Sequence, residues 1–97
     1  MAYTSRLKSD DLDQLFKAIL LLETEEECYR FFEDICTVNE LKAISQRLEV
    51  AMLLAQKKTY GEIEKATGAS TATISRINKC LVYGADGYTE MLKKLSK

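Results

Sequence analysis

Small, polar and basic side chains recur between residues 70 and 79, at spacings that bring them to one side of a helix. Hydroxyl, guanidinium and ammonium groups of this kind can bond to phosphates and to the edges of bases, and small side chains let the helix approach them closely. The sequence therefore predicts a DNA-reading surface, made by Ser70, Thr71, Ala72, Ser75, Arg76 and Lys79.

Two short helices joined at a glycine would position this surface. Thr59 and Glu62 have the spacing of a capping box, in which hydroxyl and carboxylate each bond to a free backbone N–H. Gly68 suits the left-handed residue that ends a helix, and Ser70 suits the N-cap of the next one. Apolar side chains follow where two such helices must lock together, at Ile63, Ile74 and Ile77. Residues 59–81 thus predict a helix-turn-helix, and a helical hairpin that only packs is the alternative.

The rest of the chain predicts further helices and no strand. Apolar residues at helical spacing predict helices over about residues 10–22, 24–36 and 37–56. The last two should begin at capping boxes formed by Thr24 with Glu27 and by Thr37 with Glu40. Two glycines interrupt the pattern between residues 82 and 87, and a last helix follows over about 88–95. We expect one all-α domain over residues 1–97, in which residues 1–9 form a flexible arm and 10–56 form dimerisation helices.

The composition narrows the classes of function. The 97 residues contain three cysteines, in no CxxC spacing, and no histidine, so we expect buried free thiols, no metal site, no cofactor and no catalytic residues. No apolar run is long enough to cross a membrane and no signal peptide opens the chain, so we expect a cytoplasmic protein.

Charge is divided unevenly along the chain. Residues 1–56 carry six basic and eleven acidic side chains, whereas residues 57–97 carry eight basic and four acidic ones. A polyanion should therefore meet the C-terminal half, unless the imbalance is ordinary surface scatter. The N-terminal helices carry more aromatic residues than a small reading head needs. They predict a homodimer interface, because two heads are needed to read two half-sites, or else the core of a monomer.

These segments resemble a known family. The run TVNELKAISQR, at residues 37–47, together with TYGEIEKATGASTATISR, at residues 59–76, is similar to the Trp repressor and more closely to its YerC/YecD-like branch. The resemblance implies an intertwined, all-helical homodimer that binds double-stranded operator DNA and represses transcription.

The resemblance also implies an effector pocket. Thr37, Arg47, Thr73 and Arg76 match the threonines and arginines that contact the ligand in that family. Two positions depart from the pattern: Ile77 replaces a glycine beside the bound ring, and Cys80 replaces a serine that positions the amine. We therefore expect tryptophan not to be the effector. Each matched residue also has another interpretation: an N-cap for Thr37, a bond to a carbonyl for Thr73, an ion pair for Arg47 and a phosphate contact for Arg76.

The first helix of the motif departs from the family as well. Gly61 and Glu64 replace basic residues, and Glu62 adds a second carboxylate near the expected DNA. Carboxylates repel phosphates, and nearby lysines would have to offset them. The leading hypothesis is a DNA-binding repressor. The alternative is a non-catalytic interaction module that has kept the fold and lost DNA binding, and an enzyme has no support in the sequence.

Overall fold

The computed structural model describes residues 3–96 and is all-α, as the sequence predicts. Six helices and no strand occur within this range, and none of these helices is long and apolar enough to cross a membrane. The helices are α1 (Asp10–Leu20), α2 (Glu25–Ile35), α3 (Val38–Ala55), α4 (Tyr60–Thr67), α5 (Thr71–Tyr83) and α6 (Gly87–Leu95). The chain divides into two compact units, and the boundary between them falls between Thr37 and Val38.

The first unit contains α1 and α2, and each helix begins at a hydroxyl cap. Ser9 Oγ accepts the N–H of Leu12 at 3.1 Å, and Thr24 Oγ1 accepts the N–H of Glu27 at 3.1 Å. The predicted box at Thr24 forms only in part, because the Glu27 carboxylate bonds to the N–H of Glu23 instead. Neither helix contains a buried residue. The apolar sides of both helices are therefore not buried in a core of the first unit.

The predicted arm precedes α1. Residues 1 and 2 lie outside the described part of the chain. Residues 3–9 contain no helix but do contain a turn, in which the N–H of Lys8 donates to the carbonyl of Ser5 at 3.2 Å. The flexibility of this segment remains a prediction.

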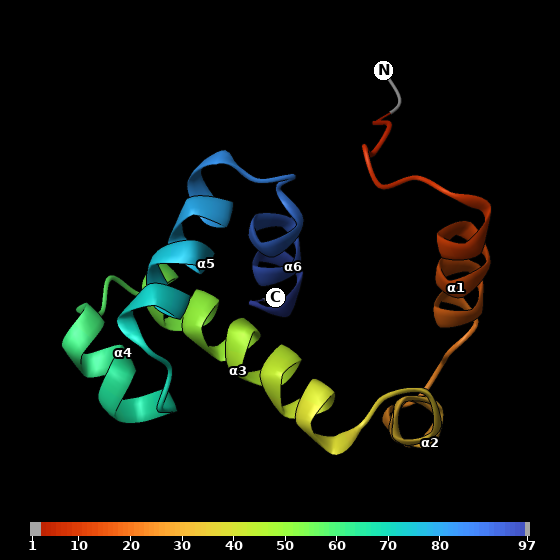
Figure 1. Cartoon of the computed structure of the whole chain (residues 1–97), viewed down its shortest axis with the longest axis horizontal. Helices are drawn as coiled ribbons and strands as arrows, with labels where there is room; N and C mark the ends of the chain where they lie inside the picture. Colours follow the sequence, from red (N-terminus) through yellow and green to blue (C-terminus); the bar gives the residue numbers. More distant parts are fainter. Residues whose placement is uncertain (1–2, 97) are drawn as a thin grey trace. The chain divides into compact units, whose positions relative to one another are not determined.

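The second unit holds the core of the described chain. Helices α4, α5 and α6 gather around the C-terminal half of α3, and the first turns of α3 extend beyond them (Figure 1). Six residues are buried, and all lie in this unit: Val50, Ala51, Ile63, Ala69, Ile74 and Ile77. Leu53, Leu54, Tyr88 and Leu92 pack against them. The three isoleucines that the sequence assigns to the lock between the helices are therefore core residues.

The turn between α4 and α5 has the predicted geometry. Thr59 and Glu62 form a complete capping box, with N···O distances of 3.0 and 3.1 Å. Helix α4 ends at Gly68, whose φ of 75° is left-handed, and Ser70 Oγ accepts the N–H of Thr73 at 3.2 Å to cap α5. Gln46 also donates its side-chain amide to the carbonyl of Thr67 at 3.0 Å, which ties this turn to α3.

Two sequence predictions are wrong in detail. Helix α5 continues through Val82 and Tyr83, which we expected to lie in a loop, and it ends only at Gly84. The cysteines are free thiols, as expected, but they are not buried in this chain: Cys28 and Cys80 are exposed and Cys36 is half-buried. Cys36 also lies just beyond the end of α2. The spacing of apolar residues predicts on which side of a helix these cysteines lie. It does not predict whether another element covers that side.

We expect Gly68→Ala to destabilise the fold, and Gly87→Ala serves as its matched control. No atom would meet a Cβ within 4 Å at either position, but only Gly68 has a positive φ. The left-handed conformation should therefore make Gly68→Ala cost about 1–2 kcal/mol of unfolding free energy. Alanine at residue 87, the first residue of α6, should be neutral or stabilise by up to about 1 kcal/mol. Urea unfolding measures both, and equal losses would contradict this explanation of the turn.

Candidate nucleic-acid interface

Helix α5 presents most of the predicted reading residues to solvent. Thr71, Ala72, Arg76 and Lys79 are exposed, and Ser75 is half-buried. Ile74 is fully buried and Ile77 is 2% exposed, so the opposite side of the same helix is fixed in the core. Neither Arg76 nor Lys79 forms a salt bridge with any described residue. Both cations are therefore available to a partner outside the chain.

The hydroxyl of Ser70 is already engaged within the chain. It accepts the N–H of Thr73 and donates to Thr73 Oγ1 at 3.1 Å. Thr73 therefore completes the N-cap of α5, rather than bonding back to a carbonyl as the structural interpretation had it. Since Ser70 is exposed, a contact with DNA would have to share this hydroxyl with the cap.

The carboxylate of Glu62 is held at the start of α4. The hydrogen bond from the backbone N–H of Thr59 contributes most to lowering the pKa of Glu62 below its ordinary value of 4.5. The Thr59 hydroxyl acts in the same direction, desolvation opposes both hydrogen bonds to a smaller extent, and the charge of Lys58 lowers the pKa least. Glu62 is thus an ionised cap of α4, whereas Glu64 is an exposed carboxylate farther along the helix. Both add negative charge to the first helix of the motif.

The structure brings together two of the six predicted effector residues. Arg47 of α3 and Cys80 of α5 line an open cavity of about 540 Å³. Thr73, Arg76 and Ile77 do not line it, and Ile77 is a core residue instead. Thr37 belongs to the other unit, so its relation to this cavity is not defined. From the family resemblance, we expected the Ile77 side chain to lie beside a bound ring. In the structure this side chain is buried among other apolar side chains.

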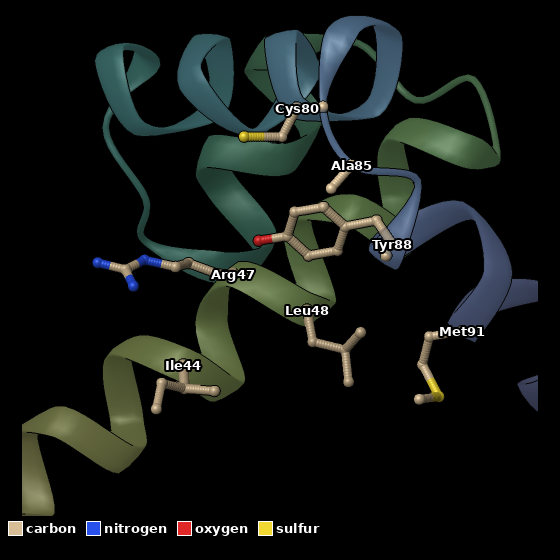
Figure 2. A pocket seen from close by; sticks show the side chains of 9 residues that line it. Ile44, Arg47, Leu48, Cys80, Ala85, Tyr88 and Met91 are labelled. Carbon is tan, nitrogen blue, oxygen red and sulfur yellow. The ribbon is translucent and has the colours of Figure 1, made fainter. Parts of the chain in front are cut away.

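An aromatic residue outside the predicted site lies in this cavity. Figure 2 shows the ring of Tyr88 below Cys80, with its hydroxyl directed to the side where Arg47 lies. The apolar part of the lining also includes Ile44, Leu48, Ala85 and Met91. Tyr88 comes from α6, whose packing on α3 and α5 no local pattern predicts. Its only sequence signal was membership of the last short helix.

The surroundings of Tyr88 change its acidity. Burial contributes most to raising the pKa of its hydroxyl above the ordinary value of 10.0, and the Cys80 thiol acts in the same direction. The Arg47 guanidinium opposes both effects, because a nearby positive charge favours the phenolate. Tyr88 is therefore a neutral hydrogen-bonding group at ordinary pH, and it lines the same cavity as Arg47 and Cys80.

Comparison with known proteins gives one consistent result. The family model described as Trp repressor protein matches residues 10–96. The uncharacterized protein YerC of Bacillus subtilis (strain 168) is 53% identical over 92 residues, which cover 95% of this chain and 88% of YerC.

Two crystal structures agree with this. A candidate Trp repressor from Staphylococcus aureus is 53% identical and has a TM-score of 0.89, with 94% of this chain and 91% of that one covered. A TrpR-like protein from Eubacterium eligens ATCC 27750 is 52% identical and has a TM-score of 0.90, with 94% of both chains covered.

The raised pKa of Tyr88 predicts a loss of stability at alkaline pH. The folded chain holds this proton more tightly than the unfolded chain, so the contribution is complete below the unfolded pKa and is lost as pH rises through the folded one. Urea unfolding between about pH 8 and 11 should therefore show a steeper decline for the wild type than for Tyr88→Phe, which cannot ionise. Parallel curves would contradict the assignment.

Proposed function

This chain belongs to the Trp repressor family, and from that premise we propose that it is a sequence-specific DNA-binding regulator that represses transcription as a homodimer. The family is one of regulators, and the resemblance in residues 37–81 is confirmed by the family match. The observation that carries the proposal is the two-sided character of α5. Its buried side fixes the helix to the core, and its opposite side offers unpaired cations and small polar groups.

We assign the proposed contacts by side-chain chemistry. Thr71, Ala72 and Ser75 face base edges, because they are small enough to enter the major groove and two of them carry a hydroxyl. Arg76 and Lys79 contact bases or phosphates. Ser70 mainly orients the helix through its cap.

We propose homodimerisation because both units leave apolar surface exposed. Helices α1 and α2 contain no buried residue, although each is amphipathic. In the other unit, Val38 is 67% exposed and Ile44 is 51% exposed on the first half of α3. A second copy offers the same surfaces, and burying them would stabilise by about 25 cal/mol per Å². Two copies also supply the two reading helices that a two-fold operator requires.

We propose that DNA binding requires no tryptophan and no cofactor. The cavity that contains Arg47 and Cys80 also holds the ring of Tyr88, a residue of the chain itself. An amino-acid effector would have to share this space. We place the protein in the cytoplasm of its host, because a regulator of this family acts where the DNA lies.

One observation favours a second candidate. Glu62 and Glu64 are exposed on α4, and negative charge beside the reading helix weakens attraction to phosphates. The second function is a non-catalytic dimerisation or interaction module that has lost DNA binding. Retention on heparin and on genomic DNA at low salt separates the two, because only the regulator is retained.

We expect Lys79→Ala to weaken binding to all DNA sequences to a similar degree. Each phosphate contact that is lost lowers the slope of log K against log salt by about 0.9. The matched control is Lys93→Ala, which removes the same charge from an exposed residue of another helix, α6. Gel shifts or fluorescence anisotropy without tryptophan, at several salt concentrations, measure both variants. Equal slopes for the two variants would contradict the assignment of Lys79.

Thr71→Val should instead alter which sequence is preferred. Valine keeps the shape of threonine and removes the hydroxyl, so a hydrogen bond to a base edge would be lost while the salt slope stays unchanged. Selection from random oligonucleotides, with wild type and variant in parallel, measures the preference. An unchanged preferred sequence would exclude Thr71 as a base contact. No binding by the wild type at low salt would contradict the proposed function.

A further inference from the structure

A lysine occupies a left-handed position in the turn between α3 and α4. Lys57 has a φ of 66°, and Asp86 is the other non-glycine residue with positive φ among residues 3–96. The N–H of Lys58 donates to the carbonyl of Leu53 at 3.1 Å, and that of Lys57 to the carbonyl of Leu54 at 3.0 Å. These two bonds form a Schellman motif, in which glycine is the preferred residue at the position of Lys57.

The backbone therefore gives no reason for a lysine here. A side chain with a Cβ is strained in the left-handed region, and the short polar side chain of aspartate tolerates it better than lysine does. Lys57 is exposed and forms no salt bridge with any described residue. Its neighbour Lys58 differs, because its charge acts on the Glu62 carboxylate. The ammonium of Lys57 thus has no salt-bridge partner among residues 3–96.

The position of Lys57 indicates a function outside the chain. It lies two residues before Thr59, the N-cap of α4, and the first helix of a helix-turn-helix crosses the DNA backbone. A helix N-terminus commonly binds phosphate, but here the Glu62 carboxylate occupies it through the capping box. A phosphate at this end of α4 needs a cation from elsewhere, and Lys57 is placed to provide it.

We propose that Lys57 of each protomer contacts a DNA phosphate and supplies the positive charge that the capped end of α4 does not. This contact rests on the proposed function, since it presupposes that the chain binds DNA. It also explains why the turn carries lysine in place of the conformationally preferred glycine.

The test combines a stability measurement with a salt titration on the full chain. Lys57→Gly relieves the left-handed strain, so the Tm should stay the same or rise by up to about 5 °C. A 20-base-pair operator taken from the oligonucleotide selection is the probe. Loss of one phosphate contact per protomer should lower its salt slope by about 1.8 in the dimer and weaken binding several-fold at physiological salt.

Two further variants complete the design. Asp86→Gly makes the same backbone change at the other left-handed residue and should leave the salt slope at the wild-type value. Lys57→Arg keeps the charge and should keep the slope. If Lys57→Gly retains the wild-type slope, the phosphate contact does not exist, although the proposed function stands. If the wild type binds no DNA, the proposed function itself fails and the contact fails with it.

Discussion

The orientation of α5 depends on one constraint. Two short capped helices, joined at a left-handed residue, must both pack on a very small apolar core. Gly68 turns the chain with a φ of 75°, and the capping hydroxyls of Thr59 and Ser70 satisfy N–H groups at the starts of the two helices. Ile63, Ile74 and Ile77 then hold both helices against Val50 and Ala51 of α3. Because one side of α5 is fixed in this way, its other side is directed outward. The polar and basic side chains on that outer side are accessible to a partner only because of this packing.

The small size of this core also affects the rest of the chain. Among residues 3–96, six residues form the buried core, and none of them comes from α1 or α2. A domain of this size has little apolar burial of its own, and in the proposed function its amphipathic helices without a core pack against another copy. In the proposed function, dimerisation and DNA reading are thus linked, since the helices that bring two chains together also set the spacing of the two reading helices. The acidic N-terminal half is compatible with the proposed function, in which the C-terminal half contacts phosphate.

Local chemistry determined what the sequence could predict. The box at Thr59 and Glu62, the turn at Gly68 and the cap at Ser70 involve residues three or fewer positions apart, and all were predictable. Predictions that depended on distant packing were weaker. The exposure of Cys28 and Cys80 and the place of Tyr88 beside Arg47 depend on which elements cover them. Helix α5 is longer than predicted because Val82 and Tyr83 are compatible with a helix. It ends at Gly84, where an added Cβ would lie 2.3 Å from the carbonyl oxygen of Cys80.

The separation of the two reading helices in solution tests the central claim most directly. Spin labels at Lys79→Cys, in a chain whose three native cysteines are replaced by serine, report this distance by pulsed electron paramagnetic resonance without DNA. A dimer that presents both copies of α5 to successive major grooves should give a narrow distribution near one turn of B-form DNA, about 34–36 Å. A monomer, or a dimer whose labels lie at a separation unrelated to one turn, would contradict the account.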